Sequence, residues 1–142
     1  MSSYILVDNF MDQKNWWNEL IMACAVIGEP FEIHCWSDEK REISLALDYG
    51  HKLATTWQDG TVIRGIITKD FLRFLTKMPK PQDILLYNKM TPFFTIALGS
   101  HLHSEHYGTE IIVSKPAKGK ESTVERVLKE VEPHAIVHRN IV

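Results

Sequence analysis

The sequence lacks any apolar run long enough to cross a bilayer. Its longest uninterrupted apolar stretch is LIMACAVI, at residues 20–27, whereas a membrane-spanning helix needs roughly 18 or more apolar residues. The first residues, MSSYILVDNF, carry no basic side chain ahead of their short apolar stretch, which is atypical of a secretion signal. We therefore expect neither a signal peptide nor a membrane partner, and we interpret residues 20–27 as the buried part of a helix.

Cysteine is scarce. Only Cys24 and Cys35 are present, and both stand among apolar neighbours. They form no C-x-x-C pair and no evenly spaced series, so neither a redox motif nor a disulfide framework is indicated. We expect two reduced, buried thiols in a cytoplasmic protein.

Local motifs of several enzyme classes are also missing. The chain contains no G-x-S-x-G and no G-x-G-x-x-G pattern, which leaves serine hydrolases and dinucleotide enzymes without support. The loop SKPAKGKES matches a phosphate-binding loop at Gly119 and Lys120. However, Ser114 and Glu121 replace the first glycine and the hydroxyl residue that the motif requires. Nucleotide hydrolysis is therefore unsupported as well.

The chain has little excess charge of either sign, and its formal net charge is −2. Residues 1–70 hold 11 acidic and 6 basic residues, whereas residues 71–142 hold 7 acidic and 10 basic ones. A general nucleic-acid binder would show a clear basic excess. The asymmetry suits an acidic patch that meets a basic partner, unless folding intermixes the two halves.

Hydrophobic periodicity and turn residues predict both strands and helices. Strands are expected at 3–8, 31–36, 52–57, 61–67, 83–88, 92–98, 109–114 and 135–142. Helices are expected at 16–27, 38–50, 69–78 and from 122 onward. Because tight turns join neighbouring strands, antiparallel pairing should dominate. We predict a single α+β domain over residues 1–142, with one twisted, mixed, largely antiparallel sheet of about six to seven strands and about four helices packed on it.

Capping and turn residues indicate where these elements begin. Residues able to accept a hydrogen bond from a first helical turn are Asn9, Ser37, Thr68 and Ser122. Ser122 and Glu125 have the spacing of a capping box, and Asp12 follows Asn9 at the acidic third position. Asp59 and Gly60, between two β-rich runs, predict a tight hairpin turn.

The stretch GSHLHSEHYG, residues 99–108, holds three of the seven histidines. His101 and His103 would share one face of a strand, and together with His106 they could bind a divalent transition metal. The G-x-H-x-H start resembles the metal-binding motif of cupins, in which the glutamate stands farther along the chain than Glu105 does here. The alternative is a polar loop. We keep a small metal-dependent enzyme or sensor as the alternative function and assign no metal ligand, cofactor or catalytic residue.

Acidic and aromatic residues gather in two stretches, EIHCWSDEKREISLALDYG and WQDG. Asp38 and Glu42 are four apart on the expected helix and share a face. Aromatic anchors beside carboxylates suit an interface with a cationic partner. Alternatively, the acids cap and solubilise the helix while the tryptophans fill the core. The candidate partner-binding residues are Trp36, Asp38, Glu39, Glu42, Asp48 and Asp59.

The size, the mild acidity and the acids of WSDEKRE and WQDG resemble bacterial immunity proteins. Such proteins neutralise a cognate toxin by plugging its active site, and the toxins are often basic nucleases. The resemblance implies a non-catalytic, cytoplasmic binding protein whose carboxylates occupy the place of nucleic-acid phosphates. Its partner would be a cognate protein toxin, without direct contact to nucleic acid.

Overall fold

Eight strands form one sheet in the order β3-β4-β2-β5-β6-β7-β1-β8, and all seven pairings are antiparallel. The computed structural model describes residues 2–7, 13–83 and 86–141. The strands are β1 (Ser2–Val7), β2 (Pro30–Trp36), β3 (Gly50–Leu53), β4 (Gly60–Ile66), β5 (Thr95–Leu98), β6 (Leu102–Glu105), β7 (Glu110–Val113) and β8 (Ala135–Ile141). The helices are α1 (Asn15–Cys24), α2 (Lys40–Leu47), α3 (Lys69–Lys77) and α4 (Glu121–Val131), with short 3-10 helices η1 (His106–Gly108) and η2 (Glu132–His134).

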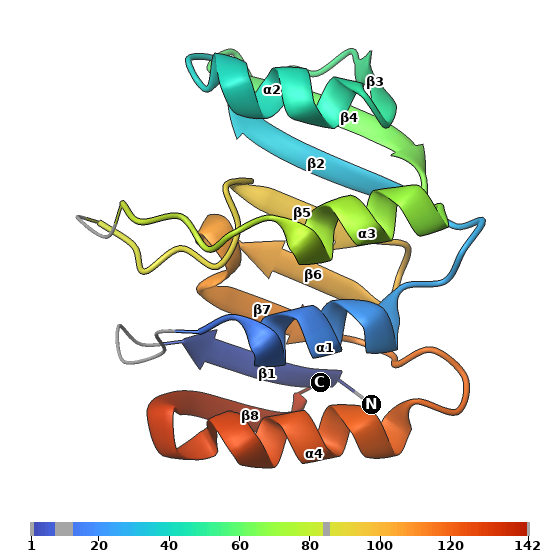
Figure 1. Cartoon of the computed structure of the whole chain (residues 1–142), viewed down its shortest axis with the longest axis vertical. Helices are drawn as coiled ribbons and strands as arrows, with labels where there is room; N and C mark the ends of the chain where they lie inside the picture. The colour runs from blue at the N-terminus through green and yellow to red at the C-terminus, as the bar shows by residue number, and fades with distance from the viewer. Residues whose placement is uncertain (1, 8–12, 84–85, 142) are drawn as a thin grey trace.

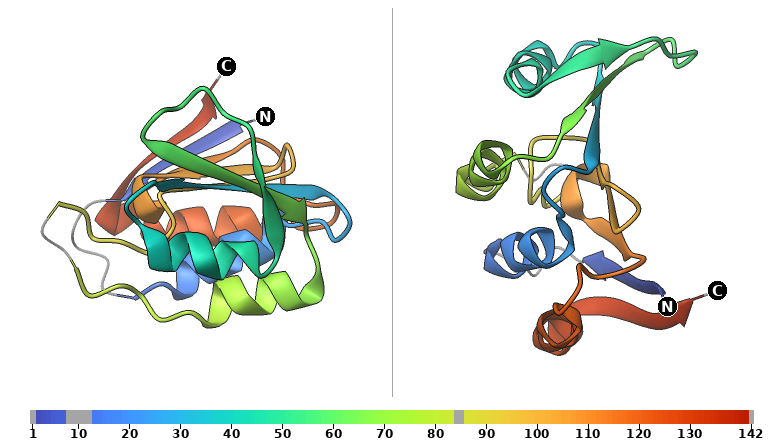
Figure 2. Two further views of the ribbon diagram at one scale, coloured as in Figure 1. Left: turned by 90° about the horizontal axis from the view of Figure 1, so that it is seen from above. Right: turned by 90° about the vertical axis from the view of Figure 1, so that its right-hand side faces the viewer.

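All four α-helices pack against the same face of the sheet (Figures 1 and 2). Side chains alternate across a strand, and along β2 Phe31, Ile33 and Cys35 are buried beneath the helices. The intervening side chains, ending at Trp36, are half-buried on the opposite face. We call this opposite side the uncovered face, because in the described part of the chain no helix lies on it.

The core lies between the helices and the sheet. Phe31 of β2 and Phe71 of α3 stack with their ring centroids 3.9 Å apart. Gly65 of β4 pairs with Phe31, and a Cβ atom at position 65 would stand 2.5 Å from the Phe31 ring. Because real side-chain atoms do not approach so closely, glycine at this position allows the aromatic stack to form.

Two side chains near the start of α1 cover the C-terminal end of α3. Lys14 Nζ donates to the Leu75 carbonyl at 3.2 Å, and Asn18 Nδ2 donates to the Thr76 carbonyl at 3.0 Å. Carbonyl groups of a last helical turn lack partners within the helix, and a cation there is favoured by the helix dipole. Burial lowers the pKa of Lys14 to about 8.

The predicted class, α+β with one largely antiparallel sheet and four helices, is confirmed. One strand differs from the prediction: residues 83, 86, 87 and 88 have no strand structure, and residues 84–85 lie outside the described part. Instead, β6 (Leu102–Glu105) supplies a strand that we did not predict. Its four residues alternate buried and half-buried, but Ser104 conceals that period because it is a polar residue at a buried position.

The predicted helix starts are only partly correct. The Thr68 hydroxyl accepts a hydrogen bond from the Phe71 N–H at 3.1 Å, as expected of a cap. Ser37 does not cap α2, because the helix begins only at Lys40 and Glu39 stands at its N-cap position. The capping box is also wrong, since α4 begins at Glu121 and contains Ser122 in its first turn. Asn9 and Asp12 lie outside the described residues.

Two boundaries shift for reasons visible in the backbone. Helix α1 ends at Cys24, because Ala25 is already extended, and not at the predicted Gly28. Strands β3 and β4 do form a hairpin, but the connection between them is the six-residue stretch 54–59 and not the predicted tight Asp-Gly turn. In that connection the Gly60 N–H donates to the Trp57 carbonyl at 3.3 Å.

Candidate functional site

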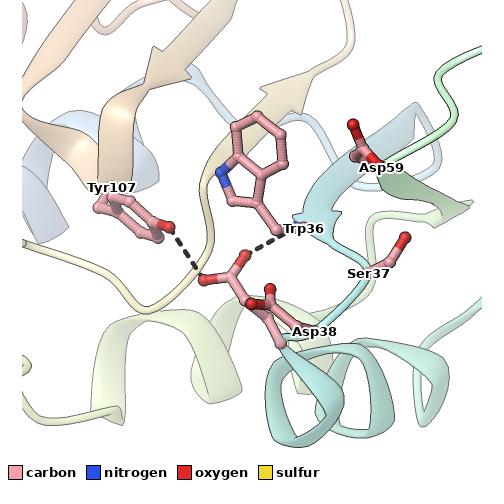
Figure 3. A pocket seen from close by; sticks show the side chains of 6 residues that line it. Trp36, Ser37, Asp38, Asp59 and Tyr107 are labelled. Carbon is pink, nitrogen blue, oxygen red and sulfur yellow. Dashed lines mark hydrogen bonds between the residues drawn. The ribbon is translucent and has the colours of Figure 1, made fainter.

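A pocket of about 610 Å³ opens where β2 passes into α2. Its wall comes from three separate segments: the β2–α2 connection, the β3–β4 connection and the turn η1. Figure 3 shows the lining side chains, with Tyr107 on one side and the aspartates on the other. The residues that line it are Trp36, Ser37, Asp38, Glu39, Asp59 and Tyr107. We call it the acidic-aromatic pocket.

Strand pairing brings the two acidic segments together. Trp36 at the end of β2 pairs with Gly60 at the start of β4. One residue farther out, the Ser37 N–H donates to the Asp59 carbonyl at 2.8 Å. Asp38 and Asp59 therefore lie in neighbouring segments, although they are far apart in the sequence.

Glu39 fastens the third segment, the turn η1, to the β2–α2 connection. Its Oε1 accepts the Trp36 backbone N–H at 2.7 Å, and its Oε2 accepts the Tyr107 hydroxyl at 3.0 Å (Figure 3). Both carboxylate oxygens are thus engaged within the protein. Burial, followed by the bond to Glu39, holds the pKa of Tyr107 well above its usual range, so the phenol remains a hydrogen-bond donor.

The turn that carries Tyr107 has an unusual backbone. The backbone φ values of His106, Tyr107 and Gly108 are 50°, 61° and 85°. This left-handed conformation is rare for residues other than glycine. The backbone N–H groups of Met90 and Thr91 both donate to the Tyr107 carbonyl, at 2.8 and 3.3 Å. Strained residues of this kind persist where surrounding contacts hold them, and they often mark functional sites.

Aromatic rings continue from the pocket onto the uncovered face. Trp36 lies 4.9 Å from Trp57 and 5.1 Å from Phe94, centroid to centroid. Phe94 in turn lies 5.3 Å from Tyr107. Both tryptophans are half-buried, so the alternative that they fill the core is wrong; the fully buried pair is Trp16 and Trp17.

The charges of the pocket are uncompensated. Asp38 and Asp59 are exposed, and none of the described basic side chains forms an ion pair with either of them. Several carboxylates elsewhere on the surface have such partners, although exposed Asp48 and Glu121 form no ion pair with a described residue either. Examples are Glu19 and Glu130 with Arg126, Asp70 with Arg73, Asp83 with Lys89, and Glu125 and Glu132 with Arg139.

The remaining two acids predicted for the interface lie elsewhere. Glu42 is half-buried, lies 4.0 Å from Arg41 and lines a neighbouring groove. Asp48 is exposed at the opposite, C-terminal end of α2. The structure therefore brings together Trp36, Asp38, Glu39 and Asp59 of the six candidates.

Sequence reasoning missed Tyr107, which lines the pocket together with Trp36. It stands 68 positions from Glu39, its hydrogen-bond partner. The glycine at position 108 was a turn signal. Nothing in the local pattern indicated which segment that turn would contact.

The three clustered histidines do not converge. His101 is buried in the β5–β6 turn, where Nδ1 lies 2.7 Å from the Lys115 carbonyl. Its Nε2 lies 3.2 Å from a carboxylate oxygen of Glu29. His101 therefore connects three chain segments at the end of the sheet away from the acidic-aromatic pocket. Together with Lys115 and Glu29 it lines a separate hollow there.

The other two histidines have separate carboxylate partners. His103 pairs with Glu105, whose second oxygen accepts the Thr95 hydroxyl at 3.1 Å. His106 Nδ1 lies 3.2 Å from Glu110. Across the described residues, no group of three or more histidine, cysteine, aspartate or glutamate side chains is arranged to hold a metal ion. The alternative site built on His101, His103 and His106 is therefore not formed.

Both cysteines are free, buried and unreactive by position. Burial raises the pKa of each thiol to about 12, and Glu39 and Glu42 contribute to the shift at Cys35. A thiol with such a pKa is a poor nucleophile at neutral pH. Among the helices that the structure describes, none has the length and apolar character to span a membrane.

Comparisons with known proteins add no relative. No family model matches the sequence, and searches of curated proteins and of solved structures find no significant match. Function must therefore be argued from the site itself and not from the fold.

Proposed function

We propose that this chain is a non-catalytic binding protein whose acidic-aromatic pocket binds a basic partner protein. The observation that carries the proposal is the pair of exposed carboxylates, Asp38 and Asp59, left without a basic partner beside the half-buried ring of Trp36. Neighbouring like charges repel each other. A partner's lysine or arginine at this position would relieve that repulsion and form charge-assisted hydrogen bonds.

The aromatic part of the lining supports the same ligand chemistry. Trp36 and Tyr107 line the same pocket as the carboxylates, and a cation over an aromatic ring is attracted by the ring's electron-rich face. The chain already contains one such contact, since Lys89 Nζ lies 4.2 Å from the centroid of the Tyr107 ring. Aromatic and arginine residues are also the side chains that most often dominate protein interfaces.

We further propose that the partner is a toxin that this chain neutralises in the bacterial cytoplasm. Many toxins that cleave nucleic acid carry basic active sites, and carboxylates held in a preformed pocket can occupy the positions of phosphates. The two buried, free thiols are compatible with a reducing compartment. The pocket's chemistry, with acidic side chains and rings, disfavours nucleic acid as a direct ligand.

The decisive experiment uses the product of the gene adjacent to the one that encodes this chain. Binding would be measured by calorimetry with the native protein and with the double variant Asp38→Asn, Asp59→Asn. We expect the double variant to lose affinity by about tenfold or more, and the native affinity to fall as salt rises. Inhibition of the partner's activity should weaken in parallel.

Asp48→Asn is the matched control, because Asp48 is equally exposed and lies at the other end of α2. It removes one negative charge, half of what the double variant removes, and leaves the pocket intact, so affinity should hardly change. If the double variant binds as tightly as the native protein and the Asp48→Asn control do, the binding face has been placed wrongly.

A further inference from the structure

A second hollow adjoins the acidic-aromatic pocket and shares Glu39 with it. This groove, of about 400 Å³, runs between α2 and the segment that links α3 to β5. The described parts of this segment, residues 78–83 and 86–94, extend to the left of α3 in Figure 1. The apolar side chains along the groove are Leu45, Met78, Pro79, Pro81 and Pro92.

The charged groups along the groove differ from those of the pocket, because they are partnered within the chain. These pairs are Arg41 with Glu42, Lys89 with Asp83, and Lys80 with Asn88. A charged ligand would have to displace these contacts. An apolar side chain would leave them in place and would cover apolar surface on both walls, a favourable change.

The groove is preformed. Leu45 and Met78 pack against the core with part of their surface and are half-buried. The prolines restrict the backbone of the opposite wall. Near its end, Met90 and Thr91 are bonded to the Tyr107 carbonyl, so the groove wall and the pocket wall belong to one bonded unit.

We propose that the groove receives an apolar side chain of the same basic partner, next to the cation that occupies the acidic-aromatic pocket. This inference rests on the proposed function. The two hollows share the Glu39 wall, so one continuous stretch of the partner reaches both. The part of the partner in the groove is uncharged, because the charged groups of the groove are already paired. The part in the pocket is cationic, because Asp38 and Asp59 are not paired.

The experiment uses synthetic peptides as defined probes. Each is a glycine-serine chain that carries one arginine and one leucine, with spacings of one to four residues between them. Companion peptides replace the arginine by glutamine or the leucine by serine. Binding is followed by NMR on protein with ¹³C-methyl methionine and ¹⁵N-indole labels, so that Met78 reports the groove and Trp36 reports the pocket.

At the best spacing we expect the Met78 and Trp36 signals to shift together and to saturate at the same peptide concentration. Replacing leucine by serine should weaken binding about tenfold, since a buried leucine contributes on that scale. Met22, exposed on α1 outside both hollows, should not shift in the same spectra. In Leu45→Ser protein the leucine preference should vanish while the arginine preference remains, and Leu47→Ser, exposed on the same helix, should change neither.

The possible failures are distinguishable. If Trp36 responds to arginine while Met78 is silent at every spacing, the groove inference is overturned and the proposed function stands. If neither residue responds to any peptide, the pocket does not take cations and both are overturned. If Met78 shifts on dilution of the protein alone, or responds to leucine without arginine, the groove has another occupant and the inference fails.

Discussion

Tyr107 donates its phenolic hydrogen to Glu39 across 3.0 Å, and this single bond joins the left-handed turn η1 to the start of α2. Glu39 also holds the Trp36 backbone N–H. One carboxylate therefore sets the relative positions of two aromatic walls of the pocket. Its role is to shape the site, whereas Asp38 and Asp59 remain available to a ligand.

Tyr107→Phe should weaken the protein and loosen the pocket. The variant keeps the ring but removes the hydroxyl, which leaves one Glu39 oxygen without its donor. We expect the free energy of unfolding to fall by about 1.5–3 kcal/mol, the usual scale for a hydrogen bond to a charged group. Chemical denaturation followed by tryptophan fluorescence would measure it.

Tyr87→Phe is the matched control for that change. Tyr87 lies beside Tyr107, with ring centroids 5.4 Å apart and the ring planes tilted by 49°. Its hydroxyl is not seen bonded to any described residue. An equal loss of stability in both variants would mean that the Tyr107–Glu39 bond contributes nothing specific.

The sequence predicted those features that depend on local chemistry. Thr68 caps α3 as expected because a cap needs only the residues of one turn. The alternating strand at residues 31–36 was likewise correct, since burial beneath helices leaves a period of two in β2. The acids of the site were found for the same reason, because Asp38 and Asp59 stand in conspicuous acidic and aromatic stretches.

Features that depend on distant contacts were not predictable. Ser37 has the chemistry of a cap, but it still belongs to the paired region, where its N–H donates to the Asp59 carbonyl, and the helix begins only at Lys40. Tyr107 enters the pocket only because η1 folds against Glu39. The histidine cluster was misleading because the three imidazoles have separate partners: His101 contacts distant residues, whereas His103 and His106 each pair with a nearby glutamate.

The two thiols should react only when the protein unfolds. Burial raises the pKa of Cys24 and Cys35 to about 12, so the thiolate fraction at neutral pH is negligible. We expect labelling by a thiol-specific disulfide reagent to be slow in buffer and rapid in denaturant. Single Cys24→Ala and Cys35→Ala variants would assign the two phases, and rapid labelling of either in buffer would contradict the buried placement.

Lys14 should make stability increase with pH in the alkaline range. Its pKa is lowered from 10.5 to about 8 in the folded protein, so between these values the unfolded chain binds more protons than the folded one. Stability therefore rises from about pH 8 to about pH 10.5 on account of this group. Over this pH range the Lys14 contribution to the free energy of unfolding should increase by about 1–3 kcal/mol.

The cysteines oppose this trend above pH 9, because their raised pKa values favour the protonated thiol in the folded state. Lys14→Met isolates the lysine contribution, because both proteins keep the same thiols. The difference in free energy of unfolding between the native protein and Lys14→Met should move in favour of the native protein as pH rises from 8 to 10.5. A difference that is constant over this range would show that Lys14 is not buried as described.

Neutralising the pocket should reduce binding without reducing stability. Asp38 and Asp59 make no ion pair with any basic side chain in the part of the chain that the structure describes, so Asp38→Asn with Asp59→Asn breaks no ion pair. We expect the free energy of unfolding to stay within about 0.5 kcal/mol of the native value or to exceed it. The same denaturation experiment at low and high salt would detect a gain that fades with screening. A clear loss of stability would instead identify the two aspartates as structural residues, and the case for a binding site at this pocket would lose its main support.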